Sequence, residues 1–168
     1  DGEDAKDFDD AVFCNLNKSL YTLKVAIADV ASVVSYNSEL DKEAFRRGTS
    51  IYFPNTVIPM LPEMISNDIC SLVPNEKRNV LVCEMIFNLH GEIESYKFYE
   101  AEINSFKRFT YDQIEDYKIN NSDICRSIKS LKKLTNKLLQ NKLKRNALEI
   151  QSIEPVIKID EDLSLIHI

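Results

Sequence analysis

Alternation of apolar and polar residues predicts two β-hairpins in this chain. Residues 11–15 and 20–30 alternate on either side of a polar turn, as two short paired strands do. A longer pair begins at residues 79–89, turns at His90-Gly91 and continues as a strand to about Ile103. The apolar residues that share one face of its first strand are Leu81, Cys83, Met85, Phe87 and Leu89.

Helical spacing of apolar residues predicts two helices. Ser38 is a typical N-cap for a helix over residues 39–47, and Gly48 supplies its stop. A second helix is expected over residues 123–143, where apolar residues recur at helical intervals. No acidic residue occurs at positions 124–148, so this helix is basic as well as amphipathic.

The segment between the first helix and the longer hairpin predicts little regular structure. Residues 51–74 contain four prolines, which interrupt both helical and strand periodicity. We expect connecting segments there, with one short helix near residues 62–67. Together the predicted elements give a mixed α/β (α+β) fold in which helices pack on an antiparallel-rich sheet.

The bulk composition is that of a single globular domain. The chain has 168 residues, 44% of them hydrophobic, and no uncharged apolar stretch near the roughly 20 residues of a membrane helix. Its four cysteines are dispersed without a CxxC pair, so we expect neither a zinc site nor a disulfide framework, and a reducing cytoplasm fits best. The net charge of −6 argues against a nucleic-acid binder, because such proteins usually carry a basic footprint.

Negative charge is concentrated at the beginning of the chain, where residues 1–10 hold six carboxylates and one lysine. The acids at positions 1, 7, 9 and 10 cannot all point the same way from a regular element, so we expect an irregular loop. Like charges this close repel unless they are protonated or neutralised, and carboxylate oxygens are ligands that Mg²⁺ prefers. The spacing differs from that of an EF-hand. On the residues alone, a catalytic Mg²⁺ site and a solvated acidic loop are alternatives of similar weight.

A further signal comes from six segments that follow one another along residues 1–118. They are DGEDAKDFDDAVFC (1–14), VAIADVA (25–31), LDKEAFRRGTSIYFPNTVIPMLPE (40–63), SNDICSL (66–72), VCEM (82–85) and YKFYEAEI (96–103). Together they resemble the catalytic domain of the ribonuclease II / ribonuclease R family, the RNB exoribonucleases. The resemblance implies a processive 3′-to-5′ hydrolytic exoribonuclease. Such an enzyme releases nucleoside 5′-monophosphates from RNA with a single-stranded 3′ end, and it uses Mg²⁺, with two ions in the full site.

The same resemblance implies roles for four aspartates. Asp1, Asp7 and Asp10 are expected to be the principal metal ligands. Asp9 is expected to orient the second metal ion or the attacking water, so Asp9 and Asp10 are the expected catalytic residues. Asp29, at a strand end, is expected to support the acidic loop.

Two tyrosines are implied as RNA-binding residues. Tyr52 resembles the family tyrosine that stacks against the 3′-terminal bases, and its structural alternative is a core tyrosine with a hydrogen-bonded hydroxyl. Tyr111 resembles a tyrosine associated with preference for RNA over DNA through the 2′-hydroxyl. The opposite stacking phenylalanine aligns with Ile150, which cannot stack a base as a ring does. We therefore expect a weaker clamp or a shifted alignment there.

The ends of the chain carry expectations of their own. Residues 1–162 are expected to be the N-terminal part of the catalytic domain, incomplete at both ends. Residues 163–168, LSLIHI, equal an in-frame translation of the sequencing adapter CTGTCTCTTATACACATC, so we expect them not to be native. The family's catalytic arginine, its acidic partner and the cold-shock and S1 domains would lie outside this chain. The basic RNA channel would then be built largely elsewhere, which removes the objection raised by the net charge.

We therefore expect the catalytic part of an exoribonuclease, with the isolated fragment inactive. Because half of the domain would be missing, apolar sheet surface should be exposed and the fragment should be marginally stable or prone to aggregation. The complete enzyme is expected to be cytoplasmic, monomeric and not attached to a membrane. The alternative is a non-catalytic remnant that binds metal, RNA or protein.

Overall fold

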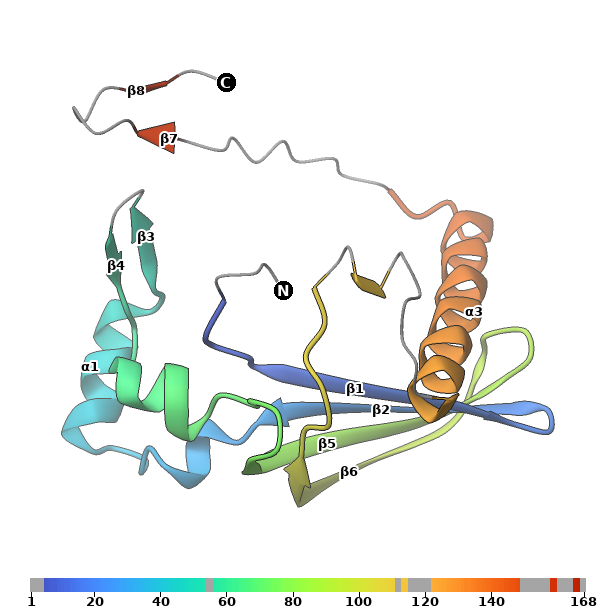
Figure 1. Cartoon of the computed structure of the whole chain (residues 1–168), viewed down its shortest axis with the longest axis horizontal. Helices are drawn as coiled ribbons and strands as arrows, with labels where there is room; N and C mark the ends of the chain where they lie inside the picture. The colour runs from blue at the N-terminus through green and yellow to red at the C-terminus, as the bar shows by residue number, and fades with distance from the viewer. Residues whose placement is uncertain are drawn as a thin grey trace.

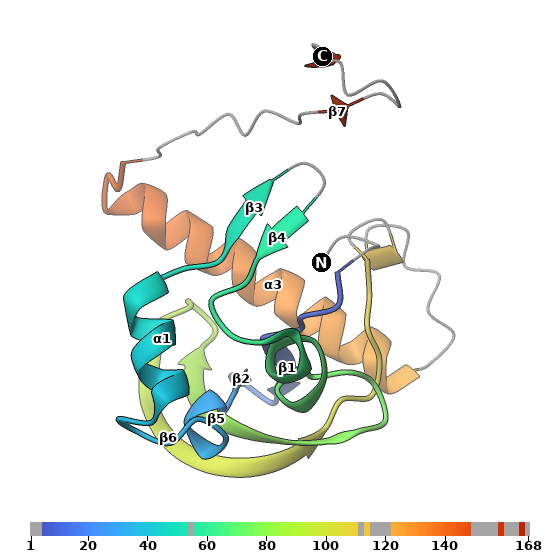
Figure 2. The ribbon, with the colours of Figure 1, turned by 90° about the vertical axis from the view of Figure 1, so that its left-hand side faces the viewer.

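The structure is a computed structural model that describes residues 5–53, 56–110, 113–114, 122–148, 158–159 and 165–166. Its centre is a four-stranded antiparallel sheet with strand order β1-β2-β5-β6 (Figure 1). The helix α3 and the hairpin β3–β4 rise from the same side of this sheet, and the turned view in Figure 2 agrees. The described helices include none long and apolar enough to span a membrane.

The central sheet consists of the two predicted hairpins, which are thereby confirmed. Its strands are β1 (Asp10–Asn17), β2 (Leu20–Ala28), β5 (Lys77–Asn88) and β6 (Ile93–Asn104). The register of the first hairpin joins Asp10 to Ile27, and the second contains an irregularity between Ile86 and Phe87. Gly91 adopts a left-handed φ of 79° in the predicted turn.

The helix α1 (Glu39–Arg47) has the predicted bounds, because its start and stop are local. The Ser38 side chain accepts a hydrogen bond from the Asp41 N–H at 3.1 Å, which satisfies one free N–H of the first turn. Gly48 ends the helix in the left-handed region, with φ 72°.

The prediction of connecting segments over residues 51–74 is wrong in part. Residues 51–53 and 56–58 form a short antiparallel hairpin of β3 (Ile51–Phe53) and β4 (Thr56–Ile58). Both strands consist of β-branched and aromatic residues, and the prolines of this segment fall outside the paired positions. A short helical segment does follow, and it contains a π-helix over Ile65–Ile69.

The predicted basic helix is confirmed as α3 (Ser122–Lys144), which packs against β1 and β2. The side chains buried between α3 and the sheet are Cys14, Tyr21 and Phe87 of the sheet and Leu134 of α3. The Cys14 N–H, on the outer edge of β1, donates to Ser127 Oγ at 3.1 Å. Burial raises the pKa of the Cys14 thiol to about 11, so this thiol is a neutral packing group.

A second apolar cluster lies at the other end of the sheet. It consists of Phe8, Ala26, Ala28, Ile65, Cys70, Leu72, Val80 and Val82. Phe8 and residues 65–72 thus cover the sheet face that carries Val80 and Val82. Phe8, two residues before β1, is therefore held by the core.

The opposite sheet face keeps apolar side chains in solvent. Leu81 is 48% exposed and Phe98 is 63% exposed, whereas Val80 and Val82, the sequence neighbours of Leu81, are buried. The apolar side chains at every second position of β5, beginning with Leu81, do share one face as predicted. Those near Leu81 are nevertheless not core residues. An exposed apolar sheet surface agrees with the expectation from the sequence.

Two further strand pieces, β7 (Lys158–Ile159) and β8 (Leu165–Ile166), pair with each other. They include part of the segment that we attribute to an adapter. That attribution and the boundary at residue 162 stay predictions.

Substituting Leu134 with alanine should destabilise the fold strongly. Leu134 is only 1% exposed, so its truncation leaves a cavity between α3 and the sheet. We expect a loss of about 2–5 kcal/mol in the free energy of unfolding, measured by urea denaturation. The matched control is Leu139→Ala on the same helix, where the side chain is 50% exposed and the loss should stay within about 0.5 kcal/mol. Equal losses in both variants would contradict this packing of α3.

Candidate active site

The acidic segment, defined as residues 5–10, enters the fold as an irregular stretch followed by a strand. Residues 5–9 have no regular secondary structure, and Asp10 is the first residue of β1. The expected irregular loop is therefore confirmed for Asp7 and Asp9. Asp1 lies outside the described residues, as do Glu3 and Asp4.

Backbone hydrogen bonds hold the acidic segment at four points. The Phe8 N–H donates to Ser71 Oγ at 3.1 Å, and the Ser71 hydroxyl donates to the Lys6 carbonyl at 2.7 Å. The Leu72 N–H donates to the Phe8 carbonyl, and the Ala28 N–H donates to the Asp9 carbonyl, both at 2.9 Å. The segment is thus fixed to two parts of the chain that are distant in sequence.

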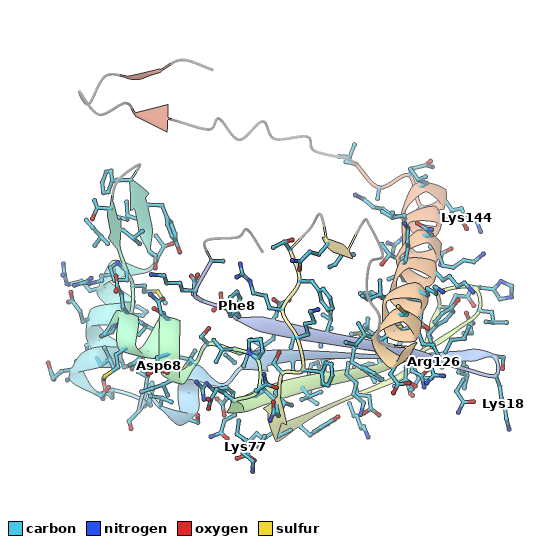
Figure 3. All side chains as sticks on the ribbon, viewed as in Figure 1. Phe8, Lys18, Asp68, Lys77, Arg126 and Lys144 are labelled. Carbon is cyan, nitrogen blue, oxygen red and sulfur yellow. The ribbon has the colours of Figure 1, made fainter. Side chains whose placement is uncertain are left out.

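Phe8 anchors the acidic segment to the core between Asp7 and Asp9. Its ring is buried in the apolar cluster beside the sheet, and the Arg108 guanidinium lies 4.9 Å from the ring centroid. Figure 3 labels Phe8 just before the start of β1. On either side of this buried ring, Asp7 is half-buried and Asp9 is exposed.

The carboxylates of the acidic segment interact unfavourably. Burial raises the pKa of Asp9 above its usual 3.8, and the negative charges of Asp7 and Asp10 raise it further. Crowded carboxylate oxygens are the donor set that a hard divalent cation such as Mg²⁺ favours. Within the described residues, however, no three His, Cys, Asp or Glu side chains form a group that could hold a metal ion. A complete ligand set would therefore need Asp1 or other groups.

Asp29 follows β2 and lines a pocket of about 260 Å³ together with Cys70 and Arg78. Its side chain accepts a hydrogen bond from the Ser32 N–H at 3.2 Å, which caps a short 3₁₀ helix. Burial raises the pKa of the Cys70 thiol, and the charges of Asp29 and Asp9 add to the effect. The described hydrogen bond of the Asp29 carboxylate is the one from the Ser32 N–H, which caps the 3₁₀ helix. Support of the acidic loop by Asp29 stays a prediction.

Tyr52 lies on β3, and its side chain is 69% exposed. The alternative of a buried core tyrosine is therefore wrong. Arg47 donates to the Pro59 carbonyl at 2.7 Å, and the Met60 N–H donates to Ser50 Oγ at 2.9 Å. These bonds fix the base of the hairpin to α1, so Tyr52 presents an open ring on an anchored support.

Two positions discussed for RNA binding lie outside the described residues. They are Tyr111, the second predicted RNA-binding tyrosine, and Ile150, which aligns with the stacking phenylalanine of the family. Of the predicted set, Asp7, Asp9 and Asp10 lie in one described segment, where the charges of Asp7 and Asp10 act on Asp9. Their assignments as metal ligands and catalytic residues stay predictions.

A broad cleft of about 710 Å³ opens beside Asp10. Aromatic and cationic side chains contribute to its lining, among them Phe13, Lys24 and Arg108. The Lys24 ammonium also forms an ion pair with Glu84 at 3.2 Å on the sheet. The cleft combines flat rings with positive charge next to the acidic segment.

Ser71 and Arg108 contact the acidic segment, although neither was predicted to do so. Ser71 is a single hydroxyl in the apolar run Ile69-Cys70-Ser71-Leu72-Val73, and a polar residue inside such a run is a signal for a specific buried hydrogen bond. Arg108 gives no comparable signal, because its contact with Phe8 spans 100 residues of sequence.

Comparison with known proteins identifies the family of this chain. The RNB domain family matches residues 1–168. Ribonuclease R of Buchnera aphidicola subsp. Acyrthosiphon pisum is 45% identical, with 98% of this chain and 24% of that protein covered. The chain therefore spans about a quarter of the length of this relative.

Solved structures show the same fold. Mycoplasma genitalium RNase R in complex with double-stranded RNA superimposes with a TM-score of 0.93 at 38% identity, over 99% of this chain and 31% of that one. Yeast Ssd1, a pseudonuclease, shares the fold with a TM-score of 0.68 at 17% identity, over 81% of this chain and 17% of that one. On the family match and the identity to ribonuclease R, the chain belongs to the RNB domain family.

Proposed function

We propose that this chain is the N-terminal part of the catalytic domain of a Mg²⁺-dependent 3′-to-5′ exoribonuclease. The enzyme would hydrolyse RNA from a single-stranded 3′ end and release nucleoside 5′-monophosphates. The observation that carries the proposal is the anchored segment with Asp7, Asp9 and Asp10 at the head of β1 in a chain of the RNB family. RNA as the partner is supported by the RNA complex of the Mycoplasma relative.

The residues proposed to hold two Mg²⁺ ions are Asp1, Asp7, Asp9 and Asp10. Bound Mg²⁺ would supply an activated water and positive charge for the phosphoryl oxygens. Asp10 would keep its place through its pairing with Ile27, and Asp9 through its carbonyl bond to Ala28. Asp9 would also orient the attacking water, which is why its charge matters for the reaction rather than for RNA affinity.

RNA affinity would come from other residues. Tyr52, exposed on its hairpin, would stack against bases near the 3′ end. Tyr111 would sense the 2′-hydroxyl and so favour RNA over DNA. Because the chain spans about a quarter of its relative, most of the RNA channel would lie in other parts of the protein.

For the whole protein we propose a monomeric enzyme of the cytoplasm. The 168-residue chain by itself should not degrade RNA, because it spans only about a quarter of its ribonuclease R relative.

The second candidate is a non-catalytic module that binds metal, RNA or protein. It is favoured by the shared fold of yeast Ssd1, a pseudonuclease, which separates this fold from nuclease activity. The crowded carboxylates of Asp7, Asp9 and Asp10 favour the enzyme instead, because such repulsion is costly unless a cation offsets it. The following experiments distinguish the two candidates.

In the full-length protein that contains this chain, Asp9→Asn should separate binding from cleavage. Asparagine keeps the size and one oxygen of the side chain but removes the charge that positions the metal ion and its water. We expect cleavage to fall by about 10²–10³ or more, with RNA binding nearly unchanged. The assays are gel analysis of a 3′-single-stranded RNA with Mg²⁺ and filter binding of the same RNA. Cleavage at the wild-type rate would exclude this acidic segment as the catalytic centre.

Tyr52→Ala should weaken RNA binding or change the length of the end product. A lost base stack costs about 1–3 kcal/mol, whereas Tyr52→Phe keeps the ring and should bind as the wild type does. Filter binding and end-product sizing on a sequencing gel give both readouts. Tyr36→Ala is the matched control, because Tyr36 is 93% exposed and lies outside the hairpin. Equal affinity of Tyr52→Ala and wild type, with the same end product, would remove Tyr52 from the RNA site.

In metal-free protein, Asp9→Asn should raise the melting temperature at neutral pH. The pKa of Asp9 is higher in the folded state than its usual 3.8, so ionisation is less favourable in the folded state and ionised Asp9 destabilises the fold. The gain should be full above the raised pKa and disappear as the pH falls below 3.8, where Asp9 is protonated in both states. Thermal melts in EDTA between about pH 3 and about pH 8 measure this effect. Glu94→Gln on β6 is the control, and a gain that is equal at every pH would contradict the expected linkage.

A further inference from the structure

A buried serine hydroxyl joins the acidic segment to the core. Ser71 is 0% exposed, and its hydroxyl donates to the Lys6 carbonyl at 2.7 Å while accepting from the Phe8 N–H at 3.1 Å. These two groups belong to the peptide units on either side of Asp7. The hydroxyl therefore uses one donor and one acceptor to hold the backbone around a single aspartate.

We propose that Ser71 is a positioning residue that sets the metal affinity of the acidic segment by fixing the backbone on both sides of Asp7. The inference rests on the proposed function, in which Asp7 is a metal ligand. Ser71 itself would contact neither metal ion nor RNA. Its effect would pass through the two backbone bonds that decide where the Asp7 carboxylate lies.

Ser71 is suited to this role because its own position is fixed. Its N–H donates to the Asp68 carbonyl at 3.0 Å, and its carbonyl accepts from Arg78 Nε at 3.0 Å. The adjacent Leu72 N–H binds the Phe8 carbonyl at 2.9 Å. The backbone that carries the Ser71 hydroxyl is thus fixed, and its next residue, Leu72, forms a further hydrogen bond to the acidic segment.

Without the Ser71 hydroxyl, the backbone around Asp7 would lose two hydrogen bonds. It would lose them in a segment where neighbouring carboxylates repel one another. In Ser71→Ala the Phe8 N–H and the Lys6 carbonyl lose their partner in a buried place, so the backbone must shift to find others. Residues that hydrogen-bond to metal ligands and thereby orient them change metal affinity by about 10–100-fold when they are removed. A weakening of that size is expected for Ser71→Ala.

A matched variant distinguishes positioning from general support of the fold. Ser130 is also buried, at 8% exposed, and its hydroxyl donates to the Arg126 carbonyl at 2.8 Å within α3. Ser130→Ala removes the same chemical group from a buried place that does not bond the acidic segment. Ser71→Cys is a second test variant, nearly equal in size to serine but a poor hydrogen-bonding group, in case Ser71→Ala does not fold.

The experiment measures Mn²⁺ binding to the full-length protein without RNA, by electron paramagnetic resonance of the free ion. Circular dichroism melts show that each variant is folded, and Asp9→Asn shows that the signal reports on the acidic segment. Ser71→Ala, or Ser71→Cys if only that variant folds, should weaken Mn²⁺ binding by about 10–100-fold, and Ser130→Ala by less than about twofold. RNA binding in EDTA should stay within about twofold of wild type for both serine sites, because phosphate and base contacts do not pass through Ser71.

Wild-type Mn²⁺ affinity in the folded Ser71 variant would overturn the proposal, and so would an equal loss in Ser130→Ala. Absence of an Asp9-dependent Mn²⁺ site in the wild type would overturn it as well. The RNA-degradation assay on the same preparations tests the proposed function separately. A protein that binds Mn²⁺ in a Ser71-dependent way but degrades no RNA would leave the role of Ser71 supported and the exoribonuclease proposal refuted.

Discussion

Repulsion among the carboxylates of Asp7, Asp9 and Asp10 is the constraint on which the arrangement of the acidic segment depends. Three negative charges at the head of one strand favour a segment that spreads apart. Burial raises the pKa of Asp9, and the charges of Asp7 and Asp10 raise it further. Burial of the Phe8 ring opposes it, since a fully buried aromatic side chain contributes about 1.5–3 kcal/mol. Apolar burial of one residue thus holds its two acidic neighbours at a defined place.

The hydrogen bonds that anchor the acidic segment depend in turn on the register of the central sheet. Ala28, which binds the Asp9 carbonyl, ends β2, and Arg78, which binds the Ser71 carbonyl, is the second residue of β5. A slip of one residue between these strands would turn every side chain to the other face and move both anchors. The buried residues Val80 and Val82 oppose such a slip, because they would be exchanged for their exposed neighbours.

The parts of the fold that the sequence predicts well are those determined locally. The bounds of α1 follow from Ser38 and Gly48, and the hairpins follow from alternation around polar turns. The β3–β4 hairpin escaped prediction because three-residue strands among prolines are too short for a periodic signal. The bond between Ser71 and Phe8 spans 63 residues, and pattern analysis within a window cannot detect it. Of the candidate site, the irregular course at Asp7 and Asp9 could be predicted, since close like charges do not fit a regular element.

Fold and chemistry are separable in this protein. The sheet, α3 and the apolar clusters are built from side chains that would pack equally well without any acid before β1, and a yeast pseudonuclease shares the fold at 17% identity. A site that lost its function could therefore keep its core while replacing aspartates that only destabilise it. Retention of three repelling carboxylates on a segment with four hydrogen-bonded anchors costs stability that the fold does not need. Such a cost is expected where strain is maintained for chemistry, and it is the physical argument for a working catalytic centre over a remnant.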